Sequence, residues 1–214
     1  KLQAGGATFS QMMEGFGVVT VMNAQIYDVS SNISFEQTAE EIRDAYKTTK
    51  PLAVIDSLKV ANVTVEGPSK TVTGGRYSNP LIKFGKSARL EMQDALGRAD
   101  AIEAFGGAIN EYKEEGCTNV VAMHISEDFA SEKVIIGESF FIDRKTGKQV
   151  KVDIIFYRVL PDSIFNLTQD AEGDATVFDM NADLLTTEIE LPVKNGETWG
   201  TELHGVFYSI IEYK

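Results

Sequence analysis

Residues 67–75, GPSKTVTGG, combine glycines with a lysine, a composition typical of phosphate-binding loops. Such a loop needs four residues between its first glycine and a Gly-Lys-Ser/Thr triplet, and a helix whose amino terminus faces the phosphates. Here Lys70 follows Gly67 by only three residues, and a strand pattern comes next. The sequence therefore argues against nucleotide binding and predicts a connection between two strands.

The acidic stretch 169–179 is the second candidate, because its carboxylates suit calcium. An EF-hand loop needs glycine at its sixth position and glutamate at its twelfth. Counted from Asp170, these positions hold Ala175 and Asn181. The spacing favours a polar turn between two strands, with an adventitious metal site as the alternative. The carboxylates of that site would be Asp170, Glu172, Asp174 and Asp179.

Histidine and cysteine chemistry is sparse. His124 and His204 lie in strand patterns with no nucleophile beside them, so we interpret both as structural. Cys117 is the single cysteine, follows Gly116 in a turn and has no activating pattern around it. One cysteine excludes an intramolecular disulfide, and one cysteine with two histidines argues against structural zinc. We expect a protein that is not an enzyme, with no catalytic residue, metal or cofactor.

The composition is that of a folded globular chain with an acidic surface. The 214 residues are 43% hydrophobic and 24% charged, and the formal net charge is −12. Proteins that grip nucleic-acid backbones need concentrated positive charge, so this balance argues against one. It suits a surface that must not stick to DNA, because like charges repel. We see no apolar run near the roughly 20 residues of a membrane helix and no N-terminal hydrophobic signal.

Strand patterns dominate the elements that would carry these residues. Residues 58–66 and 86–93 each alternate polar and apolar side chains, which predicts a wide hairpin with one polar face. From Thr118 onward nearly every segment has strand composition, and residues 143–148 form a hairpin turn in which Gly147 takes a positive φ. We predict a mainly β fold, an antiparallel β-sandwich or barrel with one or two short helices.

The first predicted helix lies within a long connection, residues 30–57. Thr38 and Glu41 have the spacing of a capping box, in which each side chain bonds the other's backbone N–H. Ile42 and Tyr46 then follow at helical intervals. These signals predict a short helix near the middle of the connection.

A second helix is predicted for residues 100–112, where apolar side chains recur three and four positions apart. Gly106 and Gly107 weaken it. Residues 1–17 are rich in glycine and are expected to be a flexible arm that orders against a partner. No linker-like composition interrupts the chain, so we predict one domain over residues 1–214.

Two stretches resemble major tail tube proteins of tailed bacteriophages. Residues 63–97 are similar to the middle of that family, where a strand ends in Glu-Gly-Pro and a loop leads to a lysine-flanked strand and Asp-Ala-Leu-Gly. Residues 165–185 are similar to its C-terminal segment, where an acidic turn precedes Val-Phe-Asp and an alternating strand. Together they cover about a quarter of the chain, and the helix predicted near residues 38–46 departs from the family pattern.

The resemblance implies a β-sandwich that closes with five copies of itself into a hexameric ring. Stacked rings would form a tube, and an inner β-barrel built by all subunits would line a channel for double-stranded DNA, which passes without specific binding. The implied partners are further copies, the tape measure protein, and tail terminator and initiator proteins. The implied location is the virion tail, assembled in the host bacterial cytoplasm without a membrane.

Two alternatives stay open beside the phage tail. One is the inner tube of a phage-derived injection device. The other is a monomeric ligand-binding β-barrel, which would need a hydrophobic cavity and would leave the glycine-rich arm without a role.

Two sets of residues follow from the tube hypothesis. The polar sides of the alternating strands would face the lumen, whereas in a monomer they would be an ordinary solvated surface. The lumen set is Asn62, Thr64, Glu66, Arg89, Glu91 and Gln93. The connection between the strands would contact a neighbouring subunit or ring. The contact set is Lys70, Arg76, Tyr77, Lys83 and Lys86.

Overall fold

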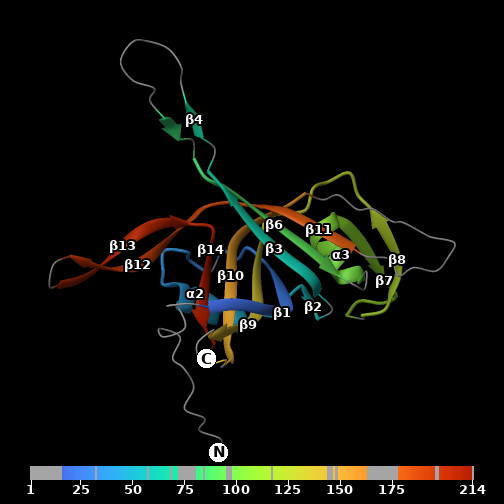
Figure 1. Cartoon of the computed structure of the whole chain (residues 1–214). Helices are drawn as coiled ribbons and strands as arrows, with labels where there is room; N and C mark the ends of the chain where they lie inside the picture. The colour runs from blue at the N-terminus through green and yellow to red at the C-terminus, as the bar shows by residue number, and fades with distance from the viewer. Residues whose placement is uncertain are drawn as a thin grey trace, which may run out of the picture.

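The fold is mainly β, as predicted, with antiparallel strands and two helices among the described residues (Figure 1). The computed structural model describes residues 16–31, 33–56, 58–67, 69–71, 81–83, 85–94, 98–116, 118–143, 147, 149–162, 178–195 and 198–213. The helices are α2 (Ala39–Lys47) and α3 (Ala99–Gly106). The strands are β1 (Phe16–Asp28), β2 (Ala53–Ile55), β3 (Leu58–Glu66), β4 (Ser69–Thr71), β5 (Leu81–Lys83), β6 (Ser87–Asp94), β7 (Ala108–Tyr112), β8 (Val120–Ile125), β9 (Lys133–Asp143), β10 (Gln149–Pro161), β11 (Phe178–Leu184), β12 (Thr187–Asn195), β13 (Thr198–Val206) and β14 (Tyr208–Glu212).

One large sheet organises these strands in the order β2-β1-β9-β10-β11-β6-β3, with β14 also paired to β10. Along one edge β10 pairs with β9; along the other it pairs with β14 at residues 152–156 and with β11 at residues 159–161. The β9 pairing shifts register between Phe156 and Val159, and such irregularities bend strands. β10 is therefore the strand at which the sheet divides.

The divided sheet folds over onto itself around the main hydrophobic core. Ile26 of β1 and Leu90 of β6 are fully buried in one cluster, although β9, β10 and β11 lie between them in the sheet order. Contact between distant strands of one sheet requires two packed layers, as in a β-sandwich. We call β1, β9, β10 and β14 the central layer, and β3, β6 and β11 the outer layer.

Helix α2 covers the opposite face of the central layer. Val134 and Ile136 of β9 pack in a cluster with Ile42 and Tyr46 of α2, whereas Ile135 between them packs in the main core. Strands of the central layer are thus buried on both faces. This double burial explains why their sequences are nearly continuous apolar runs, while the outer-layer strands alternate.

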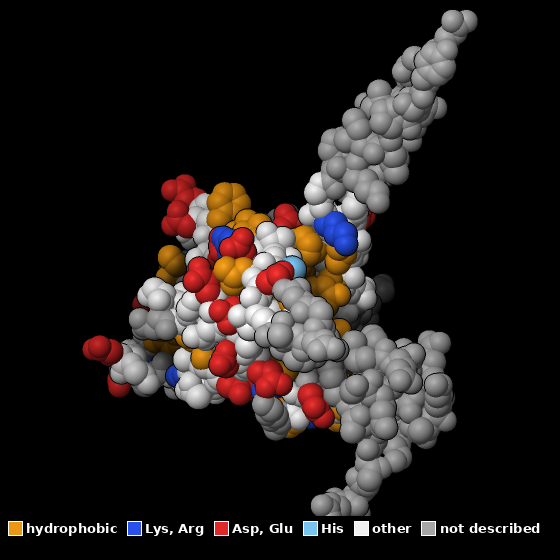
Figure 2. All heavy atoms as spheres, turned by 90° about the vertical axis from the view of Figure 1, so that its left-hand side faces the viewer, with side chains coloured by type: hydrophobic (Ala, Val, Ile, Leu, Met, Phe, Trp, Pro, Cys, Tyr) orange, Lys and Arg blue, Asp and Glu red, His pale blue; other side chains and the backbone are white. Residues whose placement is uncertain are grey.

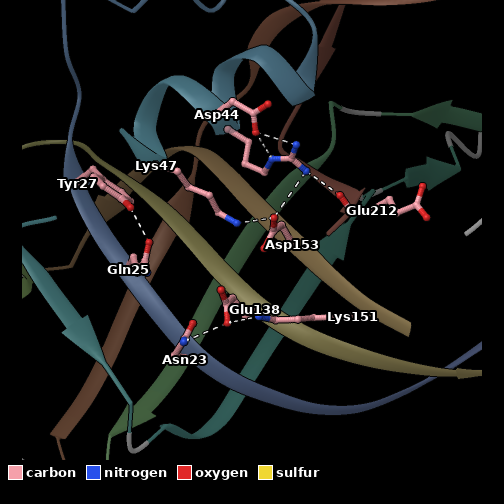
Figure 3. A network of polar contacts seen from close by, with 10 residues as sticks. Asn23, Gln25, Tyr27, Asp44, Lys47, Glu138, Lys151, Asp153 and Glu212 are labelled. Atoms are coloured by element: carbon pink, nitrogen blue, oxygen red, sulfur yellow. Dashed lines mark hydrogen bonds and ion pairs between the residues drawn. The ribbon is translucent and has the colours of Figure 1, made fainter. Parts of the chain in front are cut away.

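A buried ion-pair network fixes α2 to the central layer (Figure 3). Asp153 of β10 is fully buried, and its Oδ2 lies 2.7 Å from Lys47 Nζ and 3.6 Å from Arg43 Nη1. Arg43 Nη1 also donates a 2.7 Å hydrogen bond to the carbonyl of Glu212 in β14. A buried carboxylate needs such partners because losing its hydration is costly. The network therefore determines where α2 sits on the sheet.

The capping box predicted for the first helix is confirmed. The Thr38 hydroxyl accepts a hydrogen bond from the Glu41 backbone N–H, and the Glu41 carboxylate accepts one from the Thr38 backbone N–H. The hydrogen bond from the Thr38 side chain lowers the pKa of Glu41. The backbone N–H groups of Thr38 and Glu41 therefore both have hydrogen-bond acceptors at the start of the helix.

The second predicted helix is wrong in its second half. α3 stops before Gly107, which has a φ of 68° in the left-handed region, and residues 108–112 form β7. A Cβ at position 107 would also lie 2.6 Å from the carbonyl oxygen of Asp128. Glycine is therefore required by both backbone and space, and it ends the helix. Ile109 and Tyr112, whose spacing had indicated a helix, instead lie exposed in strand β7.

Several other boundaries differ from the predictions. β1 begins at Phe16, inside the predicted N-terminal arm, and residues 1–15 lie outside the described residues. The strand pattern near the end of the sequence, residues 201–213, is broken at Phe207 into β13 and β14. Gly147 has the positive φ predicted for the turn between β9 and β10, at 68°. Of the four carboxylates in the predicted acidic turn, Asp170, Glu172 and Asp174 lie outside the described part of the chain, and Asp179 lies in β11.

The capping box gives a direct stability prediction. Thr38→Ala removes the side chain that accepts from Glu41, so the free energy of unfolding should fall by about 1 kcal/mol. Urea denaturation followed by circular dichroism measures this change. Thr186→Ala, at an exposed threonine between β11 and β12, is the control and should change stability little. Equal effects of the two substitutions would show that the cap contributes nothing specific.

Candidate functional site

The outer layer has one apolar and one polar face. Ala88, Leu90 and Met92 of β6 are buried in the main core, and the residues between them point away from it. β3 and β11 show the same alternation. We call the exposed side of these strands the polar face. Its members are Asn62, Thr64, Glu66, Arg89, Glu91, Gln93, Asp179, Asn181 and Asp183.

The strand register brings the six predicted lumen residues together on this face. Asn62 lies opposite Glu91, and Thr64 lies opposite Arg89. The six side chains are exposed or half-exposed, and none belongs to the core. Side chains directly opposite each other on one sheet face are close neighbours. The predicted set is therefore one continuous surface of the subunit.

Strand β11 contributes polar-face residues that the sequence analysis missed. The alternation in its sequence, FDMNADL, was the available signal for a half-buried strand. Its pairing with β6 is a long-range contact that spacing along the chain does not encode. The pairs across the two strands are Asp179 with Gln93, Asn181 with Glu91, and Asp183 with Arg89.

Carboxylates surround Arg89, the one basic side chain among the described members of the polar face. Its guanidinium donates hydrogen bonds to Asp162 and, over 3.1 Å, to Asp183 Oδ1. Its Nε also lies 4.0 Å from Glu91 Oε1. The hydrogen bond to Asp162 raises the pKa of Arg89, with further help from the negative charges of Asp162 and Asp183. Because these acids already engage it, Arg89 does not offer free positive charge to an anion.

The polar face is therefore acidic as well as polar. Four of its nine members are carboxylates, and Arg89 alone opposes them. Gln93 Nε2 donates a 2.8 Å hydrogen bond to Asp179 Oδ1, so a neutral side chain also orients an acid. A surface of this kind repels phosphate groups rather than binding them.

Among the described residues, the polar face has no candidate metal site beside it. Within the described ranges, no three histidine, cysteine or carboxylate side chains gather where they could hold a metal ion. His124 lies 3.3 Å from Glu111, and His204 lies 3.7 Å from Glu202. The histidine side chains are 59% and 49% exposed, so neither packs in the core as a structural histidine would. Cys117 lies outside the described residues.

The predicted contact residues fall within residues 67–87, which we call the basic arm. Lys70 is in β4 and Lys83 is in β5, and these two strands pair. Lys86 is exposed at the base of the arm. Figure 1 shows β4 beyond the ends of β3 and β6, away from the body. Arg76 and Tyr77 lie outside the described residues.

One side of the molecule shares the acidic balance of the sequence. Figure 2 views the side that carries β12 and β13, and acidic side chains outnumber basic ones across it. No described helix has the length and apolar character needed to cross a bilayer. The basic arm is thus an exception on an otherwise acidic molecule.

No protein-family model matches the chain, and a search of curated proteins finds no match. The polar face and the basic arm are therefore the features from which a function must be inferred.

Arg89→Gln tests the electrostatics of the polar face. Removing the one cation leaves neighbouring carboxylates facing each other, so stability at about 20 mM salt should fall by about 1 kcal/mol. The loss should shrink at about 0.5 M salt, because ions screen the repulsion. Urea denaturation at both salt concentrations measures it, with Lys86→Gln as the exposed control. A loss that does not depend on salt would mean that Arg89 acts through packing rather than charge.

Proposed function

We propose that this chain is the structural subunit of a tail tube, in which hexameric rings stack into a hollow tube that conducts DNA. The acidic polar face of β3, β6 and β11 lines the lumen. The one-sided outer layer is the observation that carries the proposal, since its inner face is buried in the subunit and its outer face is polar. The resemblance of residues 63–97 and 165–185 to major tail tube proteins supplies the ring stoichiometry.

The acidity of the face suits a channel through which DNA must slide. DNA phosphates adhere to concentrated positive charge, and each contact would slow passage. The polar face has an excess of carboxylates, and acids engage its Arg89. A lumen of this composition holds DNA away from the wall by repulsion.

Open strand edges support a barrel built jointly by several subunits. β3 is the terminal strand of the large sheet in the described structure. At the other side of the outer layer, residues 179–180 of β11 pair only with β6 among the described strands. Exposed edges invite pairing with another chain, and ring closure removes them. In the proposed ring, β3 of one subunit lies beside β11 of the next, a head-to-tail contact that closes by rotation.

The interior argues against the alternative of a monomeric ligand-binding barrel. The cavity between the two layers has a volume of about 50 Å³ and is lined by Leu90, Met92, Ile135 and other apolar side chains. Small-molecule sites span roughly 300–1,000 Å³. The space inside this fold is a packing gap, too small for such a ligand.

The proposal is tested by electron microscopy and sedimentation of the purified protein at high concentration, with and without tail initiator proteins. Rings with an open centre, or tubes built from them, are expected. A species that remains monomeric under both conditions would overturn the proposal.

Charge on the basic arm should be needed for assembly. Lys70→Glu with Arg76→Glu reverses two charges within the basic arm, so tube formation should weaken while the fold stays intact. Pelleting of assembled tubes measures the first effect, and circular dichroism checks the second. Lys145→Glu with Lys148→Glu makes the same change in net charge in the sequence between β9 and β10, and should leave assembly unchanged. Normal assembly of the arm variant would refute a role for these two residues.

A further inference from the structure

Strand β8 is an apolar strand that the described part of the chain leaves uncovered. Val121, Met123 and Ile125 are 56%, 38% and 58% exposed. β8 pairs with β7 along one edge, and no described strand pairs with its other edge. Phe129, just beyond the strand, is 83% exposed. Exposed apolar surface beside an open strand edge is typical of a site where another chain docks.

A cleft beside the hairpin extends this surface. It has a volume of about 830 Å³ and lies between β2, the other terminal strand of the large sheet, and the start of β8. Leu52 and Val54 line one side, and Tyr112 and Val120 line the other. The cleft is large enough to receive the side chains of a docked segment.

The charge around this surface specifies what docks there. Residues 98–132, which we call the β7–β8 module, contain eight acidic residues and two basic ones. Lys50 and Arg98 line the cleft itself, but the acidic balance of the module as a whole favours a partner that is basic and partly apolar. The basic arm of this chain, residues 67–87, fits that description, because it contains four basic residues, no acidic residue, and Tyr77, Leu81, Ile82 and Phe84.

Topology separates the arm from the module within one molecule. The arm connects the end of β3 to the start of β6, and the module follows the end of β6. The two features therefore lie at opposite ends of the β3–β6 ribbon, as Figure 1 shows. Nine residues of strand span about 30 Å. This separation favours contact between the arm of one copy and the module of another.

The same charges disfavour a symmetric alternative. Pairing β8 of one copy with β8 of another would bring two acidic modules face to face, and like charges across an interface are costly. Contact between arm and module is attractive and joins two different surfaces. Such a head-to-tail contact repeats from copy to copy and generates a ring when its rotation closes and a filament when it does not.

We propose that the β7–β8 module of one copy is the docking site for the basic arm of another copy. β8 and the neighbouring cleft supply apolar contact, and Glu111, Glu114 and Glu115 of the exposed hairpin attract the arm's lysines. The inference rests on the proposed function in one respect, that the partner is a second copy of this chain.

Two full-length variants isolate this contact. In the arm-neutral chain, Lys70, Arg76, Lys83 and Lys86 are replaced by glutamine. In the module-neutral chain, Glu111→Gln, Glu114→Gln and Glu115→Gln weaken the docking site and leave the arm intact. Biolayer interferometry with the module-neutral chain immobilised should show that the arm-neutral chain binds. A chain with both sets of substitutions should bind at least about tenfold more weakly.

A matched pair of substitutions locates the site on the arm-neutral chain. Val121→Arg places a charge on β8, whereas Leu203→Arg places it on the exposed strand β13, where the leucine is 47% exposed. Val121→Arg should reduce binding at least about tenfold and Leu203→Arg should not. Equal binding by all variants, or a loss caused by Leu203→Arg alone, would overturn the docking proposal. Electron microscopy of the unaltered chain judges the tube separately: tubes in which this contact is absent would overturn the docking proposal alone, and binding without rings or tubes would overturn the proposed function alone.

Discussion

Burial of one face of the outer layer against the central layer is the constraint on which the rest of the structure depends. Leu90 and Met92 of β6 gain their stabilisation only when β1, β9 and β10 cover them. The sheet must therefore divide at β10 and fold over. In the folded sheet, the opposite face of β3, β6 and β11 does not pack in the core. Polar and acidic side chains can occupy it without loss of stability.

The same folding gives the subunit two unlike ends. The ribbon of β3 and β6 continues into the basic arm at one end, and the chain leaves β6 to build the acidic β7–β8 module at the other. A symmetric dimer would place like charges together. A chain with a basic donor, an acidic acceptor and open edges on its outer layer suits head-to-tail assembly. We propose that its function depends on these surfaces; the buried network around Asp153 holds α2 against the central layer.

Periodicity along the sequence predicted which strands have one buried face, but it did not predict which strands pair with each other. The alternation in β3 and β6 indicated strands with one polar face, and Asn62 and Glu91 lie on that face. Local chemistry also predicted the capping box at Thr38. The second helix failed because a single left-handed residue, Gly107, outweighed a helical spacing of apolar residues. The bonds from Arg89 to Asp162 and Asp183 join residues over 70 positions apart, and no local pattern encodes such contacts.

The central claim concerns the direction in which the polar face points. Cryo-electron microscopy of assemblies of the unaltered chain tests it most directly. The account predicts sixfold rings in which β3, β6 and β11 form the inner wall, with Asn62, Arg89 and Glu91 facing the axis. A reconstruction that places these side chains on the outer surface, or buries them between subunits, would contradict it.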